Sequence, residues 1–145
     1  MTEELEKRIE YAKELHRKGF NCCQAVVAAY ADIFGIDGNT ALRMSASFGG
    51  GMGGMRQTCG AACAMYIVCG LKCGQTDPAD REAKKQNYQQ VQQLAQRFKE
   101  IHGSTICAEL LGLKQPDDPD TVILKQPCNQ TVGNAAQIIG EWLGM

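Results

Sequence analysis

Residues 49–54 read GGGMGG, so five of six consecutive positions are glycine. Glycine loses more backbone entropy than any other residue when it is fixed in a helix or strand, and it adopts positive φ values readily. The run therefore predicts a loop. The segments before and after it must fold as separate elements that pack against each other.

Apolar residues on both sides of this loop recur at helical spacing, and no stretch alternates convincingly as a strand would. Before the loop we predict a helix that ends at Gly19, a second that Asn21 and Gln24 open with capping-box spacing, and a short third over 40–47 capped by Asn39. The apolar positions of the first two are Leu5, Ile9, Ala12, Leu15, Ala25, Val26, Ala29 and Ile33.

After the loop, Thr58 is a suitable N-cap for a helix that runs to residue 74. The longest helix is expected over 78–101, a short one capped by Ser104 up to 111, and a last one over 129–143, with a proline- and aspartate-rich loop at 113–127. Tyr88, Phe98 and Trp142 are expected core residues, and Ile101 belongs to the apolar stripe of the longest helix. The prediction is an all-α single-domain bundle of about six helices over 1–145, with a Gly-rich loop before a central Cys-bearing helix.

Charge and hydropathy narrow the classes of function. The net charge is −1 and the basic residues are dispersed, which argues against nucleic acid or a membrane surface as partner. The first residues are amphipathic and acidic, unlike a signal peptide, and no apolar run approaches ~20 residues. We expect a cytoplasmic protein without membrane insertion. The Gln-rich face of the long helix is a solvated face or a homo-oligomer contact.

Eight cysteines are many for a cytosolic chain of 145 residues. In that compartment such a count indicates metal or redox chemistry more than a disulfide framework. No Cys-x-x-Cys pair occurs, so thioredoxin-like, zinc-ribbon and c-type haem sites lack their motif.

Several cysteines fall close to expected helix starts, where unpaired N–H groups and the helix dipole stabilise a thiolate. These are Cys22, Cys59, Cys107 and Cys128. Such positions lower the pKa of a thiol below its usual ~8.5. Arg56 adds positive charge near Cys59, which therefore has the most favourable local field.

Cys63, Cys69 and Cys73 share one predicted helix with Cys59 and are expected to pack as small apolar residues. Cβ atoms at i and i+4 of a helix are ~5–6 Å apart, too far for a disulfide. One straight helix also cannot bring all four sulfurs to one zinc. His16 and His102 are expected at the surface or at helix ends, with a ligand role for His102 as a weaker alternative.

The cysteine-bearing segments together resemble a known family. GFNCCQAV offers Cys22 or Cys23, CGAACA offers Cys59, Gly60 and Ala61, and Cys107 and Cys128 lie in the two later segments. The chain resembles the family with a proposed redox role that is named for a C-GCAxxG-C-C pattern. The resemblance implies an all-helical fold and redox activity. Ala64 stands where the motif has its last glycine.

Three hypotheses follow. In the first, Cys59 takes part in thiol–disulfide exchange with an unknown redox partner, and the second thiol is Cys22, Cys23, Cys107 or Cys128. Arg56 and Gly60 are the residues expected to help bind a cofactor. In the second, Cys22, Cys59, Cys107 and Cys128 bind a soft metal ion or an iron–sulfur cluster. In the third, the chain is a non-catalytic helical interaction protein with buried free thiols. All three are left open by the sequence.

Overall fold

The computed structural model describes residues 1–112 and 125–145, and side chains of the second range from Cys128 onward. The α-helices are α1 Glu3–Arg17, α2 Cys22–Tyr30, α3 Gly38–Ser45, α4 Gly60–Cys73, α5 Arg81–His102, α6 Cys107–Leu110 and α7 Lys125–Trp142. Two 3₁₀ turns, η1 Ala31–Phe34 and η2 Ala46–Phe48, flank α3. The described residues contain no strand, so the all-α prediction is confirmed.

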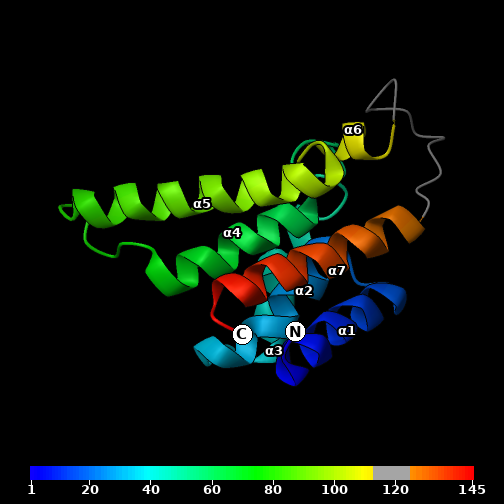
Figure 1. Ribbon diagram of the computed structural model, residues 1–145, viewed down its shortest axis with the longest axis horizontal. Helices are drawn as coiled ribbons and strands as arrows, with labels where there is room; N and C mark the ends of the chain where they lie inside the picture. Colours follow the sequence, from blue (N-terminus) through cyan, green and yellow to red (C-terminus); the bar gives the residue numbers. More distant parts are fainter. Residues whose placement is uncertain (113–124) are drawn as a thin grey trace.

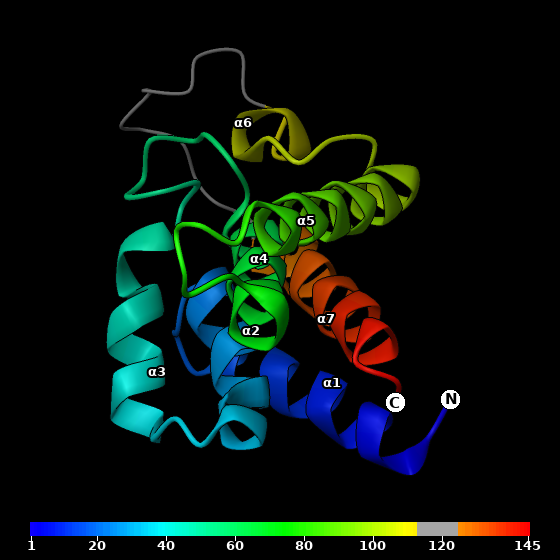
Figure 2. The ribbon, with the colours of Figure 1, turned by 90° about the vertical axis from the view of Figure 1, so that its left-hand side faces the viewer.

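Helix α2 lies at the centre and packs against α1, α3, α4 and α7, while α5 covers α4 and α7 from the other side (Figures 1 and 2). Helices α4 and α7 run opposite to the long α5. As a result, the start of α4, the end of α5, the start of α7 and the short α6 all lie at one end of the molecule, on the right in Figure 1. This arrangement positions the site described below.

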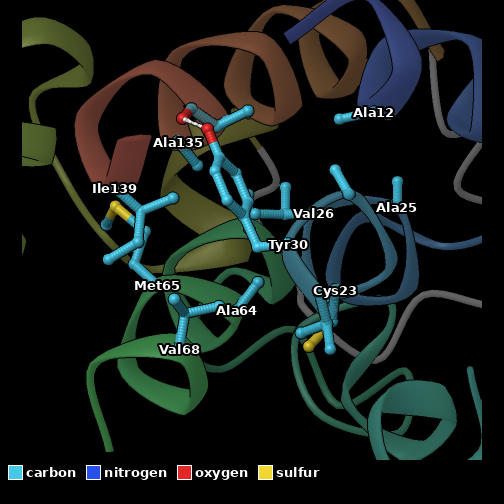
Figure 3. Close-up of a cluster of buried hydrophobic side chains, with 14 of the residues drawn as sticks. Ala12, Cys23, Ala25, Val26, Tyr30, Ala64, Met65, Val68, Ala135 and Ile139 are labelled. Carbon is cyan, nitrogen blue, oxygen red and sulfur yellow. Dashed lines mark hydrogen bonds between the residues drawn. The ribbon is translucent and has the colours of Figure 1, made fainter. Parts of the chain in front are cut away.

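The core is built from small and branched side chains of three helices (Figure 3). Val26 and Tyr30 of α2 meet Met65 of α4 and Ile139 of α7, and all four are buried. The Tyr30 hydroxyl donates a 2.6 Å hydrogen bond to the backbone carbonyl of Ala136, so its polar end is satisfied. The many alanines allow the helix axes to approach closely.

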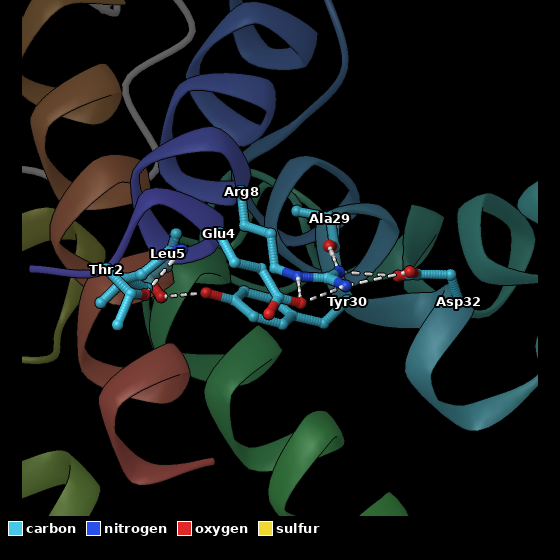
Figure 4. A network of polar contacts seen from close by, with 8 residues as sticks. Thr2, Glu4, Leu5, Arg8, Ala29, Tyr30 and Asp32 are labelled. Carbon is cyan, nitrogen blue, oxygen red and sulfur yellow. Dashed lines mark hydrogen bonds and ion pairs between the residues drawn. The ribbon is translucent and has the colours of Figure 1, made fainter. Parts of the chain in front are cut away.

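Arg8 ties α1 to the end of α2 (Figure 4). Its Nη1 donates to the carbonyl of Ala29 at 2.7 Å and to Oδ1 of Asp32 at 2.7 Å, and Glu4 accepts from its other nitrogens. The guanidinium carbon lies 5.4 Å from the Tyr30 ring centroid. A carbonyl near the end of α2 therefore gains a charged donor, as helix ends require.

Several helix starts differ from the prediction. The Asn21–Gln24 capping box is present in both directions, as expected. Helix α3 is capped by Asp37 instead of Asn39, since its carboxylate accepts from the Thr40 N–H. Cys59 occupies the N-cap position of α4 without a side-chain capping bond, in place of Thr58.

The later boundaries also shift. Ile106 is the N-cap of α6, while Ser104, the expected cap, accepts from the Ile106 N–H just before the helix. Helix α7 begins at Lys125, so the predicted loop over 113–127 is wrong at its end. Residues 113–124 of that loop lie outside the described part of the chain.

The apolar stripe of α5 is only partly a core face. Leu94 and Phe98 are buried as expected, but Tyr88 is 53% exposed and Ile101 56% exposed. The prediction of Tyr88 as a core residue is wrong, and the end of the stripe at Ile101 is also exposed, because α5 lies on the outside of the bundle. In the described part of the chain, none of the helices has the length and apolar character needed to cross a membrane.

We expect alanine substitutions at two glycines of α7 to have different effects on the stability of the protein. A Cβ at Gly140 would lie 2.3 Å from Cδ1 of Leu5 and 2.4 Å from the Tyr30 hydroxyl, whereas one at Gly133 would meet only the flexible Lys13 chain at 3.1 Å. Overpacking costs about 1–3 kcal/mol, and alanine gains about 1 kcal/mol in helix propensity. Gly140→Ala should therefore lower the free energy of unfolding in urea, and Gly133→Ala should leave it unchanged or raise it. Equal stabilities would contradict this packing.

Candidate functional site

Four cysteines from distant parts of the chain line one pocket of about 430 Å³. They are Cys22, Cys59, Cys107 and Cys128, and the pocket also contains Arg56, His16 and His102. Cys59 and Cys107 are buried, at 5% and 8% exposure, while Cys22 and Cys128 are partly exposed. The inner wall is thus formed by one pair of thiols and the accessible wall by the other.

Each of these cysteines lies in or next to the first turn of a helix. Cys22 is the first residue of α2, Cys59 the N-cap of α4, Cys107 the first residue of α6, and Cys128 the fourth residue of α7. The thiols therefore lie where the positive ends of several helices converge. Their chemical roles remain predictions.

A short stretch of paired backbone brings Cys59 next to Cys107. Thr58 and Ile106 form an isolated antiparallel bridge. The Cys59 N–H donates to the carbonyl of Thr105 at 2.7 Å, and the Cys107 N–H donates to that of Gln57 at 2.6 Å. Sequence reasoning missed this pairing, because two or three residues are too few to show an alternating pattern.

Gly60 lets the start of α4 approach the start of α2. A Cβ at this position would lie 3.0 Å from the carbonyl oxygen of Phe48, 3.2 Å from the nitrogen of Cys23 and 3.4 Å from Cβ of Cys22. Backbone atoms cannot move aside as a side chain can. The absence of a side chain at Gly60 therefore helps to place Cys59 beside Cys22.

The Gly-rich loop is folded against the same wall. Gly51 has φ +73°, and a Cβ there would lie 2.6 Å from Cβ of Cys107, so both the backbone angle and the space require glycine. The N–H groups of Met52, Gly54, Arg56 and Gln57 donate to carbonyls of the loop or of Phe48 before it. These donors are therefore already used within the loop.

Arg56 itself has a left-handed backbone, with φ 58°. This conformation is uncommon for a residue with a side chain and costs of order 1–3 kcal/mol. Its Nη1 lies 3.8 Å from Sγ of Cys107, so the guanidinium reaches into the cysteine pocket. The strained backbone thus holds a positive charge among the thiols.

Cys22 and Cys128 change each other's pKa in opposite directions. Interaction with the Cys22 side chain, together with the charge of Arg56, lowers the pKa of Cys128 to about 7 despite partial burial. Interaction with Cys128, together with burial, raises the pKa of Cys22 well above its usual range. The two thiols therefore titrate as a pair in which Cys128 is the more acidic member.

For Cys59 the expected low pKa is wrong. Burial raises the pKa of this thiol, although the N–H groups of Ala62 and Ala61 at the start of α4 act in the opposite direction. The helix-start effect is therefore present, but desolvation is the larger cause. Cys128, which is less buried than Cys59, is instead the thiol whose pKa is lowered.

The remaining cysteines lie outside the pocket. Cys23 is fully buried in the core, and burial raises its pKa, so of the adjacent pair only Cys22 faces the pocket. Cys63 is also buried, which raises its pKa to about 11. Cys69 and Cys73 lie toward the opposite end of α4, close to each other.

The two histidines both line the pocket, which sequence reasoning did not predict for His16. His16 is buried at 7% exposure, with its Nδ1 3.1 Å from Nδ2 of Asn129 and its Nε2 3.9 Å from Sγ of Cys22. His16 lies in the last turn of α1, one of the two places expected for it, but it is buried and not at the surface, because α7 packs against α1. His102 ends α5 as expected, and partial burial lowers its pKa.

A preformed metal centre is not among the features of the described residues. Within 1–112 and 128–145, no group of three or more His, Cys, Asp or Glu side chains is arranged so that it could hold a metal ion. The thiols of the pocket converge, but not at the mutual spacing of a ligand shell. Metal or cluster ligation by Cys22, Cys59, Cys107 and Cys128 remains a prediction.

Comparison with protein families now adds an independent finding. A family model described as "Putative redox-active protein (C_GCAxxG_C_C)" matches residues 20–142. The chain belongs to this family. Comparison with curated proteins and with solved structures found no match. At the position of the last glycine of the motif, Ala64 is fully buried and packs in the core near Met65 and Val68, away from the pocket (Figure 3).

The pH dependence of alkylation tests the interaction between Cys22 and Cys128. Iodoacetamide labelling of Cys128, followed by peptide mass spectrometry, should rise as pH increases through about 7, because the pKa of Cys128 is below the usual thiol range. Cys22→Ala removes the side chain that lowers this pKa most and should move the curve to higher pH. Cys63→Ala, outside the pocket, should leave it in place. An unchanged curve in the Cys22→Ala variant would refute the pairing.

Proposed function

We propose that the pocket carries out thiol–disulfide exchange, with Cys128 as the attacking thiolate and Cys22 as the resolving thiol. The observation that carries this proposal is the convergence of Cys22 and Cys128 on one pocket, where the Cys22 side chain and the charge of Arg56 lower the pKa of Cys128 to about 7. An attacking thiol performs best when its pKa is near ambient pH. Membership of a redox-active family supports the same class of chemistry.

The proposed reaction has two steps. The Cys128 thiolate attacks one sulfur of a disulfide R–S–S–R′, forms a mixed disulfide with it, and releases R′S⁻, which takes the proton of Cys22. The Cys22 thiolate then attacks Sγ of Cys128, and RS⁻ leaves and is protonated by solvent. Two protein thiols are oxidised to one disulfide and the substrate disulfide is reduced to two thiols.

The two sulfurs are suited to joining because they come from different helices. Cys22 starts α2 and Cys128 lies near the start of α7, so no shared helical backbone fixes the distance between their Cβ atoms. Arg56 places positive charge where thiolates form and leave. Cys59 and Cys107 lie behind them as a buried pair to which an oxidised Cys22–Cys128 pair can pass its disulfide.

The metal hypothesis for the pocket has less support, since the described residues contain no ready ligand group of three. The purely structural hypothesis does not account for an accessible thiol with a lowered pKa. Thiol–disulfide exchange uses both the convergence of the thiols and their unequal proton affinities.

Trapping the mixed disulfide tests the proposal. Reduced protein incubated with glutathione disulfide should form an intramolecular Cys22–Cys128 disulfide, identified by peptide mass spectrometry without reduction. Cys22→Ser should instead accumulate glutathione on Cys128, because the resolving thiol is missing. Cys128→Ser should slow the reduction of glutathione disulfide to the rate that the remaining thiols support.

The control is Cys63→Ser, which removes a thiol outside the pocket and should behave as the unaltered protein. Accumulation of glutathione mainly on Cys59 or Cys107 would reassign the attacking residue. No stable intramolecular disulfide under any glutathione ratio would reject the exchange function.

A further inference from the structure

A second group of sulfurs lies at the far end of α4, outside the pocket of Cys22 and Cys128. Sγ of Cys69 and Sγ of Cys73 are 3.7 Å apart. Oδ1 of Asn87, on α5, lies 3.6 Å from the first and 3.3 Å from the second. The three atoms therefore form a nearly equilateral triangle that joins the end of α4 to the neighbouring helix.

The dimensions of this triangle match one face of a tetrahedral metal site. With metal–sulfur bonds of ~2.3 Å and a metal–oxygen bond of ~2.1 Å, tetrahedral angles place two sulfurs about 3.8 Å apart and a sulfur and an oxygen about 3.6 Å apart. The observed separations are 3.7, 3.6 and 3.3 Å. A metal ion could bind with only small side-chain movements.

A disulfide fits this pair less well. Cys69 and Cys73 are one turn apart in the same helix, where Cβ atoms are ~5–6 Å apart, while a disulfide needs about 3.5–4.5 Å. Oxidation would have to distort the last turn of α4, whose end is held by the bond from the Gly74 N–H to the carbonyl of Gly70 at 2.8 Å. Metal binding leaves that turn intact.

We propose that Cys69, Cys73 and Asn87 bind a thiophilic divalent cation of the Zn²⁺ type, with water in the fourth position. Two thiolates balance the charge of the cation, and soft sulfur ligands favour this class of metal. Cys69 is fully buried, whereas Cys73 and Asn87 are partly exposed, which leaves a route for the ion and its water. On binding, the two thiols release two protons to solvent and form two metal–sulfur bonds.

The third ligand is an amide oxygen, so this site is consistent with the lack of any group of three His, Cys, Asp or Glu ligands among the described residues. The same three atoms are within hydrogen-bonding distance of one another, which shows that their side chains already point toward a common position. This proposal does not depend on disulfide exchange in the pocket.

Cadmium titration provides the test. The starting protein is reduced and carries Cys22→Ser and Cys128→Ser, so the accessible thiols of the pocket are absent. Cd²⁺ added to this protein should give an ultraviolet thiolate-to-metal band that saturates at one ion per chain. A further Cys69→Ser or Cys73→Ser substitution should weaken Cd²⁺ binding by at least about tenfold. A loss of that size is typical even when the residue removed only hydrogen-bonds to a metal ligand. Cys63→Ser should not change the titration.

Asn87 offers variants that keep both thiols and distinguish ligation from hydrogen bonding. Asn87→Asp supplies an anionic oxygen in the same place and should tighten Cd²⁺ binding, while Asn87→Ala should weaken it by about tenfold. Circular dichroism checks that each variant is folded. Equal Cd²⁺ affinity in the Asp and Ala variants, or a saturating band that persists without Cys69, would overturn the proposal, as would no binding in the starting protein.

Discussion

The backbone pairing between residues 57–59 and 105–107 holds the cysteine pocket together. Helix α6 has four residues, too few to be stable without outside contacts. Its first residue, Cys107, is nevertheless fixed, because its N–H donates to Gln57 while the Cys59 N–H donates back to Thr105. Through Gly60 the same segment lies against the start of α2, which carries Cys22. One short bridge and one glycine thus align three helix starts.

Within the pocket, the proton affinities follow a competition between desolvation and local charge. Cys59 has two backbone donors at the start of α4, yet burial outweighs them and its pKa rises. Cys128 is more accessible, and the Cys22 side chain and the charge of Arg56 both lower its pKa. Its pKa falls because it retains contact with solvent and also has charged or polar neighbours, which is why the proposed exchange assigns the attack to Cys128.

Local sequence signals predicted local structure well and missed what depends on tertiary contacts. The Asn21–Gln24 capping box and the loop at 49–54 could be read directly, and so could the position of Cys22, Cys59, Cys107 and Cys128 near helix starts. The exposure of Tyr88 and the burial of His16 could not, because each depends on which neighbouring helix covers that face. The order of the thiol pKa values required burial, which the sequence does not contain.

The two sulfur pairs show how helix membership determines the chemistry open to a pair of cysteines. Cys22 and Cys128 come from separate helices, so no shared helical backbone fixes the distance between their Cβ atoms. Cys69 and Cys73 belong to one turn of α4, whose backbone bonds keep their Cβ atoms too far apart for a disulfide while their sulfurs remain 3.7 Å apart. That sulfur separation suits a bridging ion. For this reason we propose reversible oxidation at the first pair and metal binding at the second, although both consist of two thiols.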